Sequence, residues 1–272
     1  TGRFSYSNPN LQQIPARHGI LGPLIRSIFI PEKDCEWGIF DYSQQEPRLV
    51  VHYASLRHFT GAGKFVDSYQ EDETTDFHTM VSEMADIPRK QAKTINLGLF
   101  YGMGKGKLMS QLGVNLETAS ELLASYNERV PFVKQLMNDT MNKAGKKGYL
   151  STLEGRRCRF DQWEPTNEWG QKSLPLAEAQ QQYGEHMIKR AWTYKALNRL
   201  IQGSAADQTK KAMLELDKEG YLAHIQVHDE LDFSVASDAD KTKIKDIMEN
   251  CVELSVPSKV DVECGDNWGD AG

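Results

Sequence analysis

Hydrophobic residues form strand-like patterns toward both ends of the chain. A short apolar and aromatic run at 37–42 predicts a buried strand, and helical periodicity from 46 to 54 predicts a helix directly after it. Strand signals return late in the sequence, as apolar runs and alternating positions at 224–227, 231–235 and 260–264. A strand that leads into a helix therefore opens the chain, and further strands close it.

The region between these strand signals is mostly helical in pattern, from 77 to about 202. Stretches of helical length lie around 90–102, 117–128, 132–145 and 177–197. Residues 161–174 are rich in Trp, Pro, Asn and Gly, which predicts a long loop. Strands, a helical insertion and strands again predict an α+β fold.

Composition excludes several classes of protein. The 272 residues can bury a sizeable core, and no stretch approaches the roughly 18 consecutive apolar residues that span a bilayer. The four cysteines form no CxxC pair and no leader precedes them, so a reducing cytoplasmic setting is expected. Because the chain opens at Thr1 rather than Met, it is expected to be a fragment of a longer protein.

Net charge by itself argues against a nucleic-acid partner, but the charge is unevenly distributed. The whole chain carries −6, of which residues 215–272 carry −10 (15 acids, 5 bases) and the remainder +4 (23 acids, 27 bases). Basic side chains cluster at 89–107 and 143–159. These local basic clusters are compatible with a nucleic-acid partner. The alternative is that they form ordinary solvated helix faces.

Acidic residues stand at the ends of predicted strands. Asp41 follows the apolar residues 38–40, and Asp229 and Glu230 lie between two strand signals, in a connection without the glycine that tight hairpins prefer. If these strands are neighbours, Asp41 and Asp229 would form a two-metal centre for phosphoryl transfer. The alternatives are that Asp41 caps the following helix and that the other two form an exposed acidic turn.

A third pattern places Arg89, Lys93, Leu97 and Tyr101 four residues apart. This spacing aligns them on one helix face. Their order suits a nucleoside triphosphate, with cations for the phosphates and the apolar and phenolic groups for the base and sugar. An ordinary amphipathic helix is the alternative, although its apolar residues would occupy such a stripe.

Neutral amides form a fourth, weaker pattern. Asn198 and Gln202 stand among small residues in the segment 198–207. Such side chains can donate to minor-groove acceptors without strong sequence preference. Polar residues beside a helix kink are the alternative.

Taken together, these segments resemble motifs A, B and C of the family A (Pol I-like) DNA polymerases, in a phage-type form. Residues 41–48 resemble motif A, 89–102 motif B and 226–230 motif C. Further segments similar to the family are 1–3, 8–12, 76–79, 155–157, 202–203 and 265–268. The segments follow the family order from one end of the chain to the other.

The resemblance implies a right-hand polymerase palm with an antiparallel sheet and a helical fingers insertion. The first part of the palm with motif A would span 1–57, the fingers with the motif B helix 58–190, and the second part of the palm with motif C 191–272. Thumb and exonuclease domains are expected upstream in the same polypeptide. The expected location is the cytoplasm of a bacterium or a phage-infected cell.

The implied activity is DNA-directed DNA polymerase, in replication or repair. It adds dNMP from dNTP to a primer 3′-hydroxyl by two-metal phosphoryl transfer and releases pyrophosphate. Asp41, Asp229 and the Tyr42 carbonyl would hold two Mg²⁺ ions, for which Mn²⁺ could substitute, with Glu230 in support. Lys93 would give a proton to the departing pyrophosphate.

The resemblance also implies the contacts with dNTP and primer-template DNA. Arg89, Lys93 and His78 would grip the triphosphate, and Glu46 would act as the steric gate against a 2′-hydroxyl. The remaining dNTP contacts would be Gln44, Leu97 and Tyr101. DNA contacts would be Arg3, Asn10, Asn198, Gln202, Gln226 and His228. Leu97 replaces the usual Phe or Tyr, as in phage-type members.

Three other functions remain to be weighed. A single-subunit RNA polymerase is opposed by Glu46 and by the Asp-Glu pair at 229–230. A two-metal nuclease would need no triphosphate-binding stripe. A catalytically inactive DNA-binding module would not need both Asp41 and Asp229.

Overall fold

The computed structural model describes residues 1–15, 18–167 and 170–272. The chain divides into two compact units. The sheet unit contains residues 2–49, 68–74 and 205–272, and the helical unit contains residue 1 with 50–67 and 75–204. The division into palm and fingers at 57 and 190 stays a prediction.

Each unit has its own secondary structure, and three helices contribute residues to both. The sheet unit holds η1 (Leu11–Gln13), α1 (Leu21–Arg26), β1 (Glu36–Tyr42), β7 (Ile225–Val227), β8 (Glu230–Val235), α11 (Asp238–Asn250) and β9 (Val260–Gly265). The helical unit holds α4 (Phe77–Ala85), α5 (Arg89–Phe100), α6 (Lys105–Leu112), α7 (Leu116–Arg129), α8 (Pro131–Lys147), β2 (Tyr149–Ser151), β3 (Arg157–Arg159), β4 (Gln162–Pro165), β5 (Leu174–Pro175), α9 (Leu176–Tyr183), β6 (Ile188–Arg190) and η2 (Thr193–Lys195). The shared helices are α2 (Gln45–Ser55), α3 (Ala62–Glu71) and α10 (Ala196–Lys218).

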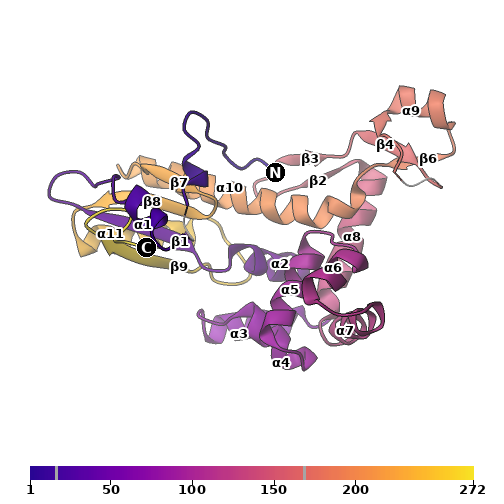
Figure 1. The fold of residues 1–272 in the computed structure, drawn as a ribbon, viewed down its shortest axis with the longest axis horizontal. Helices are drawn as coiled ribbons and strands as arrows, with labels where there is room; N and C mark the ends of the chain where they lie inside the picture. The colour runs from indigo at the N-terminus through magenta and orange to yellow at the C-terminus, as the bar shows by residue number, and fades with distance from the viewer. Residues whose placement is uncertain (16–17, 168–169) are drawn as a thin grey trace. The chain divides into compact units, whose positions relative to one another are not determined.

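The sheet unit is built on an antiparallel sheet in the order β7–β8–β1–β9. The sheet brings β1, from the first sixth of the chain, between two strands from its last sixth, as Figure 1 shows. The strands expected at both ends of the sequence are therefore confirmed. Together with the helical region between them, they confirm the α+β expectation.

Alternation along the strands produces two apolar faces. Phe40 and Tyr42 of β1 pack with α10 and α11 side chains such as Leu216 and Ile244. Trp37 and Ile39 belong to a second cluster on the opposite face, with the remaining members Ile225, Trp268 and Ala271. Because successive strand residues point to opposite faces, β1 is covered on both sides.

An aromatic core organises the helical unit. Phe77 of α4 lies 5.2 Å from Phe65 and 5.9 Å from Phe100 of α5, measured between ring centroids. Phe65 also contacts Phe132 of α8 edge-on, at 4.9 Å. These rings are fully buried, so they hold α4 and α5 against α8.

One expectation for 161–197 is wrong and another holds in part. The helix expected at 177–197 ends with α9, because Gly184 adopts φ +90° after it, and the chain then forms β6 and η2. The loop expected at 161–174 begins with β4, which pairs with β6 and β5, whereas 166–167 and 170–173 are irregular and 168–169 lie outside the described residues. Strand pairing across sequence-distant residues overrode the local helical pattern.

Among the helices of the described residues, none is both long enough and apolar enough to cross a membrane.

Candidate active site

Acidic side chains converge where β1 ends in the sheet unit. Asp41 lies opposite Glu230 of β8 on one side and Asp261 of β9 on the other. Directly opposed residues in antiparallel strands project to the same face, so the three carboxylates share it. Asp229 is adjacent, because its carbonyl accepts the Tyr42 N–H at 3.2 Å. These four residues, Asp41, Asp229, Glu230 and Asp261, are called the acidic edge below.

The hairpin between β7 and β8 delivers Asp229 to this edge. His228 occupies the left-handed region at φ +58°, which a tight hairpin turn requires and which histidine tolerates better than most residues. The Gln226 amide donates to the His228 carbonyl at 2.6 Å. This bond braces the turn, so no glycine is needed there.

Burial and like charges shape the electrostatics of the edge. Burial first, and then repulsion by Asp229, Glu230 and Asp261, raise the pKa of Asp41 to about 7. Burial also raises the pKa of Asp229 and Glu230. Crowded carboxylates that repel one another are the donors that hard divalent cations bind, so these residues fit Mg²⁺.

The arrangement of side chains that could bind a metal ion was compared across the described residues. Among the described residues, no group of three or more His, Cys, Asp and Glu side chains is arranged to hold a metal ion. A cation at the acidic edge would therefore also draw on backbone carbonyl, water or phosphate oxygens. The expected ligand set of Asp41, Asp229 and the Tyr42 carbonyl has this composition.

Asp232 is a buried acid that the sequence did not single out. It lies in β8 opposite Ile39, on the face that carries Asp41 and Glu230, and it is fully buried. No donor among the described residues satisfies it as a charged carboxylate, but a protonated Asp232 can share a hydrogen bond with Glu230. Burial and the nearby Glu230 raise its pKa strongly. The alternation of apolar and polar residues in 231–235 predicts that Asp232 faces solvent. The cluster that contains Trp37 and Trp268 covers this face instead.

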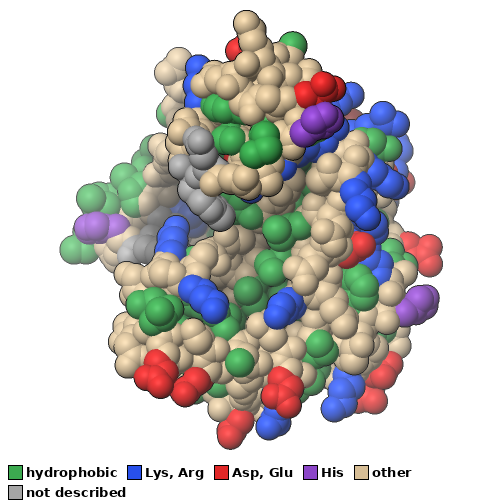
Figure 2. All heavy atoms as spheres, turned by 90° about the vertical axis from the view of Figure 1, so that its right-hand side faces the viewer, with side chains coloured by type: hydrophobic (Ala, Val, Ile, Leu, Met, Phe, Trp, Pro, Cys, Tyr) green, Lys and Arg blue, Asp and Glu red, His purple; other side chains and the backbone are tan. Residues whose placement is uncertain are grey.

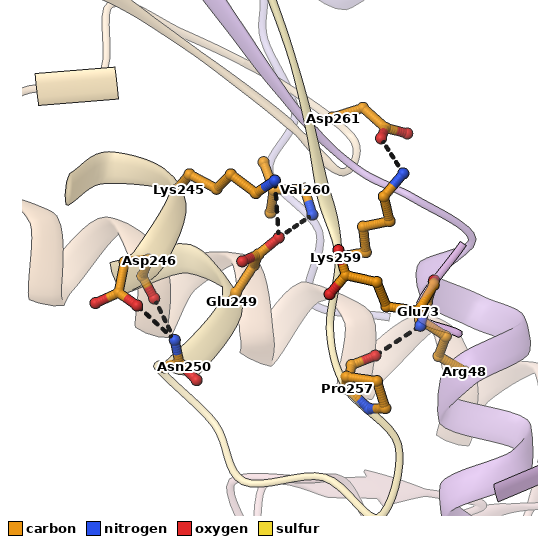
Figure 3. A network of polar contacts seen from close by, with 10 residues as sticks. All are labelled: Arg48, Glu73, Lys245, Asp246, Glu249, Asn250, Pro257, Lys259, Val260 and Asp261. Carbon is orange, nitrogen blue, oxygen red and sulfur yellow. Dashed lines mark hydrogen bonds and ion pairs between the residues drawn. The ribbon is translucent and has the colours of Figure 1, made fainter. Parts of the chain in front are cut away.

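Arg48 anchors the turn that follows β1. Its buried guanidinium donates to the carbonyls of Ser43, Pro257 and Glu73 at 2.5–2.9 Å. Figure 3 shows this side chain reaching the segment before β9, where Lys259 is ion-paired to Asp261 at 2.7 Å. The Glu249 carboxylate accepts the Val260 N–H in the same network. Arg48 therefore ties the turn after Asp41 to the strand that carries Asp261.

Glu46 and Arg3 meet beside the acidic edge. The Arg3 guanidinium is ion-paired to the Glu46 carboxylate at 2.9 Å, and both side chains are at least two-thirds shielded from solvent. Arg3 also acts on Asp229, whose pKa it lowers against the effect of burial. The expected steric gate thus has a defined orientation within the sheet unit.

The residues expected to contact DNA in this unit differ in exposure. His228 is exposed, whereas Gln226 is 4% exposed and accepts a hydrogen bond from Gln12. Asn10 is half-buried and caps η1 through the Gln12 N–H. Of these three residues, only His228 is exposed.

The stripe of α5 lies in the helical unit. Arg89, Lys93 and Tyr101 are exposed and Leu97 is half-buried, while Ile95, Asn96 and other residues of the opposite face are buried. The helix begins after Pro88, which cannot continue a helix upstream. Arg89, Lys93, Leu97 and Tyr101 are called the α5 stripe below.

Arg89, the first residue of the α5 stripe, is held by an acidic side chain. The Arg89 guanidinium forms a two-point ion pair with Asp76, at 2.8 and 3.1 Å. Although burial opposes it, hydrogen bonds from Arg89 and Thr79 lower the pKa of Asp76 to about 2. Asp76 therefore stays ionised and holds Arg89 at the start of α5.

A buried relay orients His78. The Tyr126 hydroxyl donates to the Asn96 side-chain oxygen, and the Asn96 amide lies 2.9 Å from His78 Nδ1. With its oxygen engaged, Asn96 donates to Nδ1, which leaves the hydrogen of a neutral imidazole on Nε2. Burial lowers the pKa of His78 to about 4, so the ring is neutral at pH 7. His78 can therefore act as a neutral hydrogen-bond donor.

The remaining expected residues are half-buried. Asn198 and Gln202 lie on the first turns of α10, in the helical unit, and Gln44 lies in the turn after β1 at φ +53°. The carboxylates are thus gathered within the sheet unit, and the residues expected to bind the triphosphate lie within the helical unit.

Comparisons with known proteins agree with one family. The sequence model of DNA polymerase family A matches residues 1–270. A DNA-directed DNA polymerase of Pseudomonas phage M6 is 38% identical over 309 residues, covering 98% of this chain and 43% of the relative. DNA polymerase I of Bacillus subtilis (strain 168) is 34% identical over 284 residues, covering 100% of this chain and 30% of the relative.

A solved structure extends the similarity to the fold. The POL domain of Pol1 from M. smegmatis, in complex with DNA primer-template and dNTP, matches with a TM-score of 0.78 and 30% identity. The match covers 99% of this chain and 46% of that one. This similarity confirms the expected polymerase palm-and-fingers fold. The chain spans less than half the length of these three proteins.

Proposed function

The chain belongs to the family A DNA polymerases, and from this premise we propose that it is a nucleotidyl-transfer core that extends a DNA primer along a template. In the reaction, the primer 3′-oxygen forms a bond to the α-phosphorus of a dNTP. The bond to the β-phosphate oxygen breaks, pyrophosphate leaves, and the 3′-hydroxyl gives up its proton to solvent. The process served is replication or repair.

One observation carries the proposal. Asp41 lies opposite Glu230 and Asp261, and Asp229 is adjacent. Directly opposed like charges destabilise a sheet, so a structural role does not explain them. A reaction that brings phosphates and divalent cations together explains why these carboxylates lie opposite one another. This cluster supports a catalytic core over an inactive DNA-binding module.

The proposed metal ligands are Asp41, Asp229 and the Tyr42 carbonyl, with Glu230 in support. Two Mg²⁺ ions, or Mn²⁺ in their place, would supply activation of the 3′-hydroxyl and neutralisation of phosphate charge. Arg48 holds the Ser43 carbonyl in the turn after β1, and the Tyr42 N–H, bonded to the Asp229 carbonyl, keeps this segment next to Asp229. Arg3 orients Glu46, the proposed gate against ribonucleotides.

Residues of the helical unit would bind the triphosphate. Arg89 and Lys93 contribute positive charge, and the neutral His78 donates from Nε2. Lys93 would also protonate the departing pyrophosphate. Leu97, Tyr101 and Gln44 are proposed to contact the base and sugar.

DNA contacts are proposed for side chains of both units. They are Arg3, Asn10, Asn198, Gln202, Gln226 and His228. For Gln226, the buried position favours an indirect contribution, through the turn that holds His228. Thumb and exonuclease domains of the same polypeptide are the proposed partners in the chain, and the cytoplasm of a bacterium or phage-infected cell is the proposed location.

Primer extension tests this function. The purified protein is given a labelled primer-template, each dNTP in turn and Mg²⁺, and template-directed addition of the complementary nucleotide is expected. Asp41→Asn and Asp229→Asn should each reduce addition by at least about 10³-fold, because an amide is a poor Mg²⁺ ligand. Primer-template binding should be retained.

The matched control is Asp238→Asn, which neutralises a 96% exposed carboxylate of α11 in the same unit. It should leave addition unchanged. Shortening of the primer without dNTP would favour a nuclease, and equal use of rNTP and dNTP would favour an RNA polymerase. Normal extension by either acidic-edge variant would refute the two-metal assignment.

A further inference from the structure

Asp261 is the member of the acidic edge to which the proposed ligand set gives no role. It lies directly opposite Asp41, in the position that Glu230 occupies on the other side of β1. Its side chain is 54% exposed. An open carboxylate next to Asp41 offers oxygens of the kind that hard divalent cations bind. Asp261 would therefore compete for the cations proposed at Asp41 and Asp229 unless another group engaged it.

Lys259 engages Asp261 directly. Its ammonium nitrogen lies 2.7 Å from an oxygen of the Asp261 carboxylate, as Figure 3 shows. The Lys259 side chain is 20% exposed, so most of it is shielded from solvent. Shielded ion pairs are screened by salt less than exposed ones. The pair therefore places a positive charge beside the carboxylates of the acidic edge.

The backbone that carries Lys259 is anchored at three successive residues. In segment 257–259, a carbonyl, a hydroxyl and a carbonyl accept hydrogen bonds in turn from the Arg48 side chain, the Gln208 side chain and the Ser43 N–H. These bonds are 2.7, 2.9 and 2.9 Å long. An ion pair on a fixed backbone loses less conformational entropy than one between mobile segments. The position of Lys259 is therefore built into the fold.

Cations are scarce in the part of the chain that carries Asp261. Residues 215–272 contain five bases and fifteen acids, whereas Lys and Arg side chains are spread over the face viewed in Figure 2, at the end that carries α7, α8 and α9. The other four bases are ion-paired to acids outside the acidic edge; they are Lys218, Lys241, Lys243 and Lys245. Among the described ion pairs of these five bases, only that of Lys259 engages the acidic edge.

We propose that Lys259 keeps Asp261 from binding divalent cations and thereby confines them to Asp41 and Asp229. While the ion pair is closed, the ammonium neutralises the Asp261 carboxylate, and a cation that binds Asp261 must first displace it. Lys259 is thus a positioning residue, which acts through the choice of metal ligands. That these cations serve nucleotide addition rests on the proposed function, whereas the effect of the ion pair on metal binding does not.

Binding of Mn²⁺ to the protein without DNA or dNTP tests the proposal. Free Mn²⁺ is measured by electron paramagnetic resonance in wild type and in Lys259→Met, which keeps an unbranched apolar side chain and removes the charge. The variant should bind Mn²⁺ at least about fivefold more tightly, because the freed carboxylate adds one negative charge beside a doubly charged ion. Lys259→Arg preserves the ion pair and should bind Mn²⁺ as wild type does.

A second substitution shows whether the gain comes from Asp261. The double variant Lys259→Met, Asp261→Asn should return to the wild-type affinity within about twofold, because the freed carboxylate is then an amide. Lys245→Met is the matched control, since it removes a lysine of α11 that is ion-paired to Glu249 at 3.7 Å in the network of Figure 3. It should not change the Mn²⁺ affinity. Melting temperatures in EDTA show whether all variants fold.

Salt separates direct binding by Asp261 from an effect of charge at a distance. In about 1 M KCl the Debye length falls to roughly 3 Å. If Asp261 binds Mn²⁺ directly in Lys259→Met, most of the gain in affinity should persist in this salt. A gain that vanishes would overturn the proposal, because Lys259 would then act only as a nearby charge.

The remaining outcomes separate this proposal from the polymerase function. Wild-type Mn²⁺ affinity in Lys259→Met, or an equal gain in the double variant, would overturn the role of the ion pair even if primer extension is normal. Weaker dNTP binding with unchanged Mn²⁺ affinity would also overturn it and reassign Lys259 to a phosphate contact. A gain that depends on Asp261 and resists salt would support the ion pair even without template-directed extension, and the polymerase assignment alone would then fail.

Discussion

The acidic edge and the α5 stripe are assembled in opposite ways. The edge needs three strands from the two ends of the chain, in one register, and its members repel one another. The stripe follows from one helix, and its cations lie in solvent or pair with Asp76. The edge therefore depends on tertiary structure and costs stability, whereas the stripe is local and costs little. Variants of the two regions should differ accordingly.

The largest expected contrast lies at Asp41, where loss of activity should accompany a gain in stability. The folded state raises the pKa of Asp41 from 3.8 to about 7, so it binds a proton more tightly than the unfolded chain between those values. Without metal, stability should therefore fall as pH rises from about 4 to about 7, and the part of the loss that comes from Asp41 should be complete above 7.

Asp41→Asn removes the Asp41 share of this dependence and should raise the melting temperature at pH 8 by several degrees, although it abolishes nucleotide addition. Melting curves in EDTA at pH 5 and pH 8 measure the effect. Added Mg²⁺ should stabilise wild type at pH 8 more than at pH 5. A variant less stable than wild type at pH 8 would mean that the carboxylate contributes more by packing or hydrogen bonding than it costs by repulsion.

Lys93→Ala should lower the efficiency of dNTP addition by roughly 100-fold with no gain in stability, because no buried charge is relieved. The effect should appear in both the dNTP concentration dependence and the maximal rate, since the ammonium serves the bound triphosphate and the leaving pyrophosphate. Lys90→Ala, an exposed lysine of α5 off the stripe, is the control. Normal dNTP kinetics with weaker primer-template binding would reassign Lys93 to DNA.

Glu46→Ala should admit ribonucleotides, with the preference for dNTP over rNTP reduced by roughly 10-fold or more. Removing the side chain opens space where a 2′-hydroxyl would fit. It also frees Arg3 from its ion pair. Arg3→Ala separates the two effects, because it keeps the carboxylate. Unchanged sugar selectivity in Glu46→Ala would move the gate elsewhere.

The smallest effect is expected at Leu97. An aromatic contact contributes roughly 0.5 to 1.5 kcal/mol beyond its buried area, which corresponds to about 2- to 12-fold in rate. Leu97→Phe should therefore speed single-nucleotide addition by a factor in this range and alter discrimination against ddNTP. Pre-steady-state rates for the Leu, Phe and Tyr forms, with dNTP and ddNTP, measure it. Identical rates would mean that Leu97 only packs.

Local patterns predicted much of this architecture. Strong periodicity placed α5 and the strands within a few residues, since apolar spacing reports which face is buried. The helical pattern at 177–197 gave a wrong prediction, because β6 pairs with β4 across more than twenty residues and Trp192 takes a left-handed conformation. Asp232 and Arg48 drew no attention in the sequence, because their importance comes from what covers them.

The sequence by itself determined which chemistry the chain carries. The order of the acidic and basic segments identified the family, and four-residue spacing placed the α5 stripe on one face, because a helix turns every 3.6 residues. Tertiary structure alone decided that Asp41 faces Glu230 and Asp261, and that Asn96 and Tyr126 orient His78. Strand register and side-chain packing join residues far apart in sequence, and no local periodicity records such pairings.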